Sequence, residues 1–593
     1  MRLIIITGIN LIFCLSCFAD EDYTLEKIVV TGGPAANENR NYPCQTLRSQ
    51  DIAGKHADSL PDILKCVPGV DLRYRGVSGL QGDLSIRGAT YEQSAILIDG
   101  IRINDPQTGH YNLDIPLTSL DIERIEVMKQ GSSSMYGAGA LAGGINIVTK
   151  KPLKKSVIIK TLAGEHALYG QAFSCAMPEK DHFSNFSFEH KTSNGARPNT
   201  DFDYQTYSYM FNKDWQDNSF DLLAGYQDKD YGADSFYSNL FNEEEEHTKT
   251  LFIKTGVDSD MCSYGLKNSV FLRRHHDKFI LKRNEPEFSR NTHTSYSYGF
   301  HSGINLPMTY GEIQSGFEIA RDTINSTNLG KNTRMNEACF AGFAPYPGNK
   351  FEPSARFRLD HFQNWSYQNS FDAGLGYWLI DNKLKIKSSF GHAFRGPSFT
   401  ELYYSDPANK GNPNLEVEKS DSYSAGFEAA VRDNIKIECD AFTRRVKNLI
   451  DYTRPTTNDV WQASNIGRVD FKGVELRACV KETSFSYTYM EADKDNEGFL
   501  SKYGLDILKH QLTLELGHEV RGVNIGWQFS YNERKFGETY FIGNIHISRA
   551  LKNNKTTIEP FIKIDNFTDT DYSEVAGVIQ PGRWIQGGVT VKW

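Results

Sequence analysis

The chain ends with RWIQGGVTVKW, residues 583–593, and this segment alternates between two kinds of side chain. One set is Ile585, Gly587, Val589, Val591 and Trp593, and the residues between them are Gln586, Gly588, Thr590 and Lys592. Because successive side chains of a β-strand point to opposite faces, the pattern predicts a strand with one apolar and one polar face.

The same period of two recurs through the carboxy-terminal three quarters of the chain. GVNIGWQFSYNER (522–534), SFSYTYM (484–490) and HQLTLELGHE (510–519) place apolar or aromatic residues at alternate positions. Tyr, Trp and Phe crowd the ends of many runs, as in the aromatic girdles of transmembrane barrels. A soluble β-sandwich also alternates, but repetition and aromatic content favour the barrel. We therefore predict an all-β transmembrane barrel over residues 157–593, with about 22 antiparallel strands. The aromatic residue at the end of the last strand, Trp593, is typical of outer-membrane barrels.

The front of the chain follows a different pattern. Residues 1–19 have one positive charge at Arg2, an apolar run and a small-x-small ending, which is typical of a secretory signal. Residues 43–152 mix short strands with a helix in SLPDILKCVPGVDLR (59–73), where Ser59 is a candidate N-cap and Pro68 and Gly69 end the helix. We predict a compact α+β domain that fits the lumen of a large barrel.

Small residues interrupt two apolar runs in RIEVMKQGSSSMYGAGALAGGINIVTK, residues 124–150. A flexible linker would explain them, but Ile145, Ile147 and Val148 resume a strand at once. Gly and Ala let one backbone pass close to another, so we predict that this segment is a packing surface of the domain.

Composition narrows the function classes. The net charge of -9 is spread along the chain without a basic stripe, so we expect no nucleic-acid partner. No nucleophile motif such as GxSxG occurs and the histidines are scattered, so we expect no enzyme and no required cofactor. The chain contains no CxxC pair, so a zinc site is not expected. Cys44 and Cys66 could form a disulfide in an oxidising compartment or be two separate buried thiols.

Several motifs resemble those of the TonB-dependent outer-membrane receptor family. In chain order they are EKIVVTG (26–32), LSIRGAT (84–90), ILIDGIRIND (96–105), RIEVMKQGSSSMYGAGALAGGINIVTKK (124–151), FRGPSFTELYYSDPANKGNPNLEVEKSDSYSAGFE (394–428), NIGRVDFKGVELRA (465–478) and IKIDNFTDTDYSE (562–574). The resemblance implies an active transporter in the outer membrane of a Gram-negative-type cell. It also implies that residues 43–152 form a plug domain inside the barrel, and we expect a monomer surrounded by outer-membrane lipid.

The resemblance further implies that residues 20–42 are a periplasmic tail containing a TonB box. The residues of the box are Glu26, Lys27, Ile28, Val29, Val30, Thr31 and Gly32. The β-branched side chains of Ile28, Val29 and Val30 suit an added strand at the edge of a partner's sheet. The implied partners are TonB and its inner-membrane energising complex, which would supply the work of transport.

The substrate is expected where plug tips meet external loops, in RINDPQTGHYNLDIP (102–116). The candidate binding residues are Asn104, Asp105, Gln107, Thr108, His110, Tyr111 and Asn112. This stretch and YGADSFYSN (231–239) resemble the cobalamin receptors of the family, so the first hypothesis is import of cobalamin or a related corrinoid. A ferric siderophore or haem importer is the alternative. A passive porin or adhesin would leave the plug and the tail unexplained.

Three charged features complete the predictions. Gln130 carries no charge at a position where the family often has a basic residue and Lys129 is one residue away, so Arg87 is the candidate for pairing with a barrel carboxylate. The resemblance makes calcium a possible structural ion, with Asp201, Asp203, Asp228, Asp230 and Asp234 as its ligands. The acidic run Glu243–Glu246 is interpreted as solvated charge on an external loop.

Overall fold

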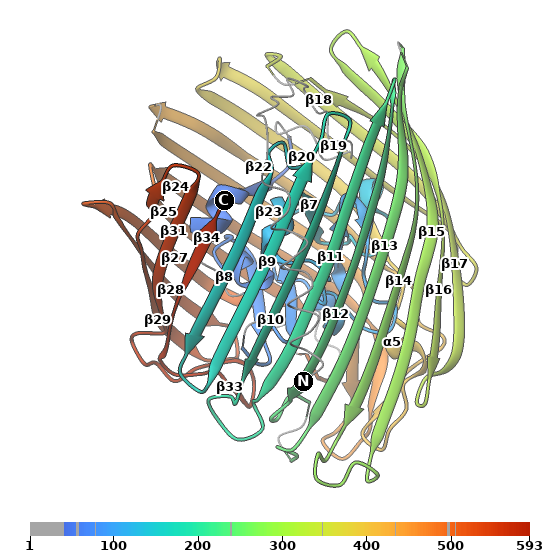
Figure 1. The fold of residues 1–593 in the computed structure, drawn as a ribbon. Helices are drawn as coiled ribbons and strands as arrows, with labels where there is room; N and C mark the ends of the chain where they lie inside the picture. Colours follow the sequence, from blue (N-terminus) through green and yellow to red (C-terminus); the bar gives the residue numbers. More distant parts are fainter. Residues whose placement is uncertain are drawn as a thin grey trace.

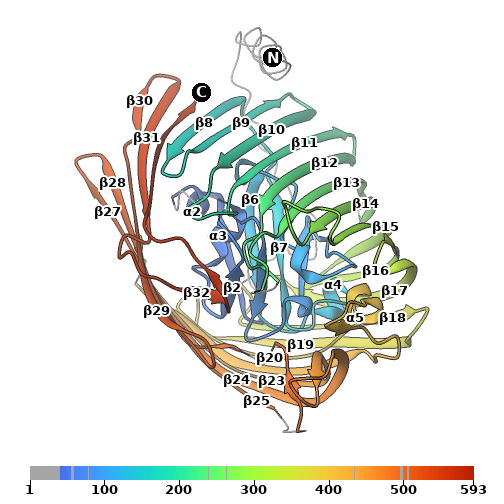
Figure 2. The ribbon, with the colours of Figure 1, turned by 90° about the horizontal axis from the view of Figure 1, so that it is seen from below.

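The structure is a computed structural model, and it describes residues 41–593 apart from 55–58, 78, 238–239, 262, 347, 433, 495–497 and 504–505. The expected signal segment 1–19 and the expected TonB box 26–32 lie outside these described residues. The described chain forms a closed barrel of long tilted strands (Figure 1) around a smaller mixed domain, which Figure 2 shows lying within the ring of strands.

The barrel is antiparallel with 22 spanning strands, as predicted. The spanning strands are β8 (Ser156–Gly164), β9 (Leu168–Pro178), β10 (His182–Ser193), β11 (Phe202–Trp215), β12 (Asn218–Gly232), β13 (Glu245–Met261), β14 (Tyr264–Ile280), β15 (Arg290–Met308), β16 (Gly311–Ser326), β17 (Gly330–Pro345), β18 (Phe351–Phe362), β19 (Ser366–Ile380), β20 (Leu384–Arg395), β22 (Glu418–Arg432), β23 (Ile435–Arg454), β24 (Trp461–Val480), β25 (Thr483–Lys494), β27 (Leu508–Val520), β28 (Val523–Arg534), β29 (Thr539–Ser548), β31 (Thr556–Asp565) and β34 (Trp584–Lys592). Short strands β21 (Asn409–Lys410), β26 (Leu500–Ser501) and β30 (Leu551–Asn553) extend its edges, and β32 (Ser573–Val575) pairs with β33 (Val578–Ile579).

The last strand closes the barrel. β34 pairs antiparallel with β31 on one side and with β8 on the other, and the Trp593 N–H donates to the Val157 carbonyl at 3.0 Å. Alternation along the strands follows the predicted two faces: in β25, Ser486 and Thr488 are buried, whereas Tyr487 and Tyr489 are on the partly exposed outer face.

The two ends of the barrel have different connections. One end has short turns, such as residues 216–217 between β11 and β12, and the other has long loops, such as 233–244 and 396–417. Short turns face the periplasm and long loops face outward in outer-membrane barrels, so the long-loop end is the outer one. Within the described residues, no helix is long and apolar enough to span a membrane.

The inner domain, the plug, is built around a mixed sheet in the order β1-β6-β7-β4-β5. These strands are β1 (Cys44–Arg48), β6 (Ile122–Met128), β7 (Gly143–Thr149), β4 (Ser94–Ile98) and β5 (Ile101–Arg102), with β2 (Val70–Tyr74) and β3 (Gly82–Ile86) as a separate pair. The helices are α2 (Ser49–Gly54), α3 (Leu60–Leu64) and α4 (Ser133–Tyr136), with short 3-10 turns η1 (Tyr91–Gln93), η2 (Gly109–Tyr111) and η3 (Ser119–Asp121).

Two details of the plug follow from its sequence. Ser59 caps α3 by accepting a hydrogen bond from the Asp62 N–H at 3.4 Å, as predicted, although the helix ends at Leu64, before Pro68. Cys44 and Cys66 are thiols, and the Gln528 side-chain amide donates to the Cys66 sulfur at 2.7 Å. The disulfide that the sequence left open is therefore not formed.

The glycine- and alanine-rich segment is a packing surface, as predicted. Ala140 and Ala142 are fully buried. A Cβ on Gly143 would lie 2.1 Å from the Met128 carbonyl oxygen, and one on Gly144 would lie 2.6 Å from the Ala95 carbonyl oxygen. Gly143 also has φ +128, which side-chain-bearing residues rarely adopt. Small residues are therefore required for β7 to lie between β6 and β4.

Candidate functional site

The predicted substrate segment, residues 102–116, reaches the outer end of the plug, but most of its candidate binding side chains are buried. Asp105, Gln107, Thr108, Tyr111 and Asn112 are buried, and of the seven candidates only Asn104 and His110 are partly exposed. Asn104 fixes β4: it donates to the Ser94 carbonyl at 2.9 Å and accepts from the Ile96 N–H at 2.9 Å.

Three of the buried members, Asp105, Gln107 and Tyr111, anchor the plug to β13 and β14, whereas Thr108 and Asn112 form hydrogen bonds within the plug. Arg273 donates to Asp105 at 2.6 Å, and the Gln107 side-chain amide donates to Asp277 at 3.2 Å. The Tyr111 hydroxyl donates to Glu246. Because a buried polar group requires a partner, these contacts use the groups that the sequence analysis reserved for a ligand.

The acidic run before β13 differs from its interpretation as solvated charge. Glu243 is exposed, but Glu244 and Glu246 have no exposed surface. Strand alternation turns Glu246 inward, where it accepts hydrogen bonds from Tyr111 and, at 2.7 Å, from Tyr231. The interpretation is therefore wrong for these two residues. The run continues into β13 at Glu245, which turns Glu246 inward, and Glu244 in the loop is buried where it accepts a hydrogen bond from the Tyr237 N–H at 3.0 Å.

His110 is the member of the segment that faces the outer opening with aromatic neighbours. Its ring stacks on Tyr91 with centroids 4.2 Å apart, and Tyr237 lies edge-on at 6.0 Å. Tyr503 meets Tyr91 edge-on at 5.8 Å. We call Tyr91, His110, Tyr237 and Tyr503 the aromatic cluster; it joins two plug segments to two long loops and offers ring faces and hydroxyls to a ligand.

A charge-balanced group supports the aromatic cluster from below. The His110 Nδ1 atom lies 2.6 Å from an Asp83 oxygen and 3.0 Å from Arg75 Nη1, and Arg75 also pairs with Asp83 at 3.2 Å. Burial lowers the pKa of His110, partly offset by Asp83. Burial alone would raise the pKa of Asp83, but Arg75 and His110 outweigh it and lower the pKa to about 2. The carboxylate therefore neutralises Arg75.

Two of the four members of the aromatic cluster were not predicted from the sequence. Tyr237 lies in the quoted stretch 231–239, but Tyr91 and Tyr503 were not singled out. The available signal was an aromatic residue in a polar, turn-rich connection, where ligand-contacting residues concentrate. That signal could not show that three loops far apart in the chain converge.

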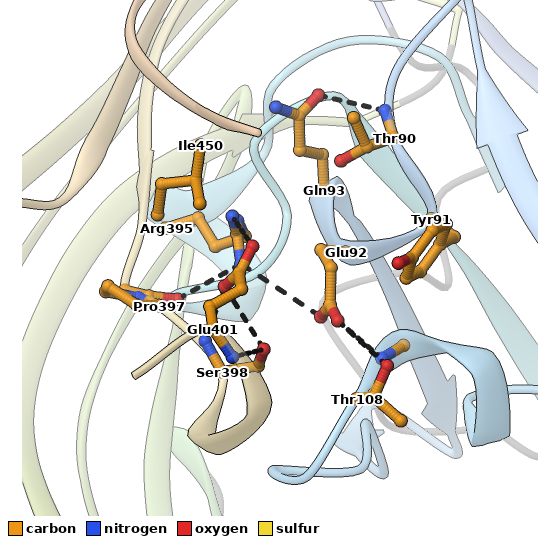
Figure 3. A network of polar contacts seen from close by, with 12 residues as sticks. Thr90, Tyr91, Glu92, Gln93, Thr108, Arg395, Pro397, Ser398, Glu401 and Ile450 are labelled. Carbon is orange, nitrogen blue, oxygen red and sulfur yellow. Dashed lines mark hydrogen bonds and ion pairs between the residues drawn. The ribbon is translucent and has the colours of Figure 1, made fainter. Parts of the chain in front are cut away.

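The loop after β20 is fastened to the plug beside the aromatic cluster, as Figure 3 shows. Arg395, at the end of β20, pairs with Glu401 at 2.8 Å and Glu418 at 2.6 Å, and lies 4.0 Å from the plug's Glu92. Glu401 belongs to the short helix α5 (Phe399–Tyr403), whose N-cap is Ser398; the Ser398 side chain accepts a hydrogen bond from the Glu401 N–H. Main-chain bonds add to the contact: Phe399 donates to the Pro106 carbonyl at 2.9 Å and Thr400 to that of Gln107 at 3.0 Å.

Arg87 meets a barrel carboxylate, in agreement with the prediction. Its guanidinium donates to both oxygens of Glu475 on β24, at 2.8 and 3.0 Å. Lys129 also reaches Glu475, at 2.9 Å, so the sequence analysis was wrong to leave Lys129 out of the ion pair. The strand β6 ends at Met128, and the chain beyond it turns the Lys129 side chain toward the wall.

The five aspartates of the possible calcium site are not gathered into one ligand set. Each lies against a basic side chain: Asp201 with Arg283, Asp203 with His190, Asp228 with Lys249, Asp230 with His247 and Asp234 with Arg197. Among the described residues, no group of three or more His, Cys, Asp or Glu is placed to hold a metal ion. Calcium binding stays a prediction that these ion pairs do not support.

A barrel with 22 strands, a domain filling its lumen and an aromatic cluster at its outer opening define a plugged transporter of the outer membrane. Residues 167–577 match the family model of the TonB dependent receptor-like β-barrel, and residues 37–144 match that of the TonB-dependent receptor plug domain. The chain belongs to the TonB-dependent receptor family. Members of this family are transporters rather than enzymes.

Curated relatives include vitamin B12 transporters. The BtuB protein of Vibrio vulnificus strain YJ016 is 24% identical over 550 residues, covering 88% of this chain and 84% of the relative. The BtuB protein of Vibrio cholerae serotype O1 is 25% identical over 599 residues, covering 94% of each chain. The chain thus spans nearly the whole of these relatives.

Solved structures share the fold. The siderophore receptor PirA from Pseudomonas aeruginosa matches with a TM-score of 0.73 at 18% identity, covering 93% of this chain and 99% of that one. The copper transporter OprC matches with a TM-score of 0.78 at 15% identity, covering 93% and 98%. Family membership places the protein in the Gram-negative outer membrane, where it interacts with TonB and binds a small-molecule substrate.

Proposed function

We propose that the protein imports cobalamin or a related corrinoid. The observation that carries the proposal is the aromatic cluster above a neutralised charge pair. Tyr91 and His110 stack, Tyr237 and Tyr503 stand edge-on nearby, and Asp83 neutralises Arg75. A corrinoid is a large, nearly flat ring with uncharged amide arms, which suits ring faces and hydroxyls more than a cluster of unpaired cations.

One further observation supports this ligand over an anionic metal chelate. The relatives named for vitamin B12 transport align with 88% and 94% of the chain. The similar solved structures include siderophore receptors, but at 18% identity or less they support the fold alone.

The sequence of uptake follows from the arrangement. A corrinoid rests on the aromatic cluster, the loop after β20 covers it, and TonB pulls on the amino-terminal tail to open the plug. Ligand binding at the outer end and availability of the tail to TonB are linked reciprocally, because a plug conformation that favours one of them also favours the other.

The test is a titration of the purified detergent-solubilised protein with cyanocobalamin and, separately, with ferric siderophores and haem, each with and without calcium. Saturable binding of cyanocobalamin in the nanomolar to micromolar range, weaker or absent for the iron ligands, is expected. Tight binding of a ferric chelate or haem with none of cyanocobalamin would overturn the corrinoid proposal and favour an iron importer on the same fold. A requirement for calcium would revive the aspartate site.

A further inference from the structure

A cavity of about 150 Å³ separates the plug from one side of the barrel wall. On the plug side it is lined by β5, β7 and their turns, including Arg102 and Asn146, and on the wall side by residues of β10 to β16. Its lower part reaches Asp258 and Lys267, which are paired across β13 and β14. Asp258 lies three residues before the end of β13 and Lys267 three residues after the start of β14, where a short turn joins the two strands. The cavity therefore extends toward the periplasmic rim.

The lining of this cavity is charged and mixed in sign. Arg102 of the plug shares it with Glu318 and Asp322 of β16, and Lys254 of β13 shares it with Asp221 of β12, which it pairs with at 3.0 Å. A cavity with such walls is suited to water and to a polar solute, whereas empty cavities in proteins are apolar.

A second cavity of about 40 Å³ lies next to the first, on the outer side. The two share Arg102, Asn104 and Asp322 as lining residues. The second is bounded above by residues of the fastened loop in Figure 3, Arg395, Pro397 and Ser398, together with Glu92 of the plug. The two cavities thus adjoin at Arg102, Asn104 and Asp322, and together they extend from the loop after β20 toward the periplasmic rim.

The opposite side of the plug is closed by strong contacts. There Glu475 holds both Arg87 and Lys129, and Arg534 of β28 holds Asp71 with two bonds of 2.8 and 3.0 Å. Separating either group would leave a buried charge without its partner, which is costly. Buried pairs also join the plug to the wall beside the cavity, Asp105 with Arg273 of β14 and Asp114 with Lys229 of β12, both at 2.6 Å. The line of cavities, rather than weaker contacts, therefore distinguishes this side of the plug from the side of β24 and β28.

We propose that the substrate crosses the barrel along this line of cavities, between the β5–β7 side of the plug and strands β10 to β18. At the outer end, the loop after β20 releases Pro106 and Gln107. Where the two cavities adjoin, Arg102 moves away from Asp322, and the plug stays attached to β24 and β28. A corrinoid is larger than the cavities, so the plug must shift to widen them. The proposal rests on the proposed function only in that a ligand is carried, whichever ligand that is.

The test places bulk in the line of cavities without touching the aromatic cluster. Ala320 of β16 is buried, points inward and lines the larger cavity, and its neighbour Ile319 faces the lipid. Ala320→Cys is the variant and Ile319→Cys the matched control. Each is expressed as the full chain in cells and treated with a bulky methanethiosulfonate reagent, alongside the wild type, whose own cysteines report any background. Ala320→Trp and Ile319→Trp repeat the comparison without a reagent.

The expected result is that modified Ala320→Cys and Ala320→Trp bind cyanocobalamin at the surface as the wild type does, while uptake falls by about tenfold or more, because the added group occupies the cavity through which the substrate would pass. Reduction of the modified cysteine should restore uptake, which excludes a folding defect. Both Ile319 variants should transport normally. Unchanged uptake by the modified Ala320 variant would overturn the proposal.

The outcome is separable from that of the proposed function. If the wild type transports a ferric chelate and no cyanocobalamin, the corrinoid proposal fails, and the same four variants are compared on that chelate. Loss of transport in the Ala320 variants would then still support the path, and normal transport would still overturn it.

Discussion

The guanidinium of Arg87 in the plug forms two hydrogen bonds with the carboxylate of Glu475 in the barrel wall, and Lys129 bonds to the same carboxylate. Glu475→Gln would leave two buried cations without an anion, so we expect the attachment of the plug to weaken by about 3–5 kcal/mol. Hydrogen exchange of plug peptides, followed by mass spectrometry, measures this. Glu491→Gln is the control, since its pair with Lys472 is exposed to solvent, where an ion pair contributes little to stability. Equal exchange in both variants would contradict the assignment.

The position of Tyr91 in the aromatic cluster predicts that its substitution weakens ligand binding. Tyr91→Ala removes the ring stacked on His110 and should weaken ligand binding by about tenfold, or about 1.4 kcal/mol. Tyr91→Phe keeps the ring and should bind nearly as the wild type does. Tyr207→Ala, on the outer face of β11, is the control. Binding isotherms of the purified variants decide the matter, and a Tyr91→Ala protein with unaltered affinity would place the ligand elsewhere.

The environment of Glu92 predicts that the attachment of the plug to the loop after β20 depends on pH. Burial, and then the charge of Glu401, raise its pKa to about 8, opposed by Arg395. A carboxyl whose pKa is raised by folding stabilises the fold while protonated, so this contribution is complete below the unfolded pKa of 4.5 and is lost as the pH rises through about 8. Amides of residues 106–112 should therefore exchange faster at pH 9 than at pH 6, after correction for the intrinsic rate.

Glu92→Gln should remove this pH dependence, because glutamine still accepts the hydrogen bond from the Gly109 N–H at 2.8 Å but does not ionise. Glu123→Gln, an exposed plug residue, should keep the wild-type behaviour. A pH dependence that persists in Glu92→Gln would assign it to another group.

Deletion of Glu26 to Gly32 tests the coupling to TonB. Uptake into energised cells should fall to the background of a strain without TonB, while surface binding of the ligand stays the same, because the aromatic cluster lies at the outer end of the plug. A deletion of equal length in the following stretch 34–40 controls for tail length. Uptake that survives loss of the box would indicate a passive pore.

Most of the architecture could be predicted from the sequence because it depends on local periodicity. The alternation in residues 484–490 and 583–593 comes directly from the two-sided environment of a barrel strand, and both segments are strands with the expected faces. The Gly143–Gly144 pair was predictable for the same reason, since small residues between two apolar strands indicate close backbone contact.

The site was only partly predictable because its partners come from distant strands. The sequence around Asp105 and Gln107 shows polar groups in a turn-rich segment, but not that Arg273 and Asp277 lie opposite and occupy them. The same applies to Glu246, whose burial depends on where β13 begins, and to Lys129, whose direction depends on where β6 ends. Pattern reasoning identifies candidate groups; the fold determines which of them remain available.

The strand that follows the tail sits at the margin of the plug sheet. Among the described strands β1 pairs with β6 alone, and its first residue, Cys44, is opposite Met128 at the end of that ladder. A force applied to the tail loads these bonds one after another, so β1 should unzip before the remaining sheet bears tension and lengthen the tether by about 17 Å at about 3.3 Å per residue. Single-molecule force spectroscopy should record a small early extension of that size, absent when β1 is stapled to β6.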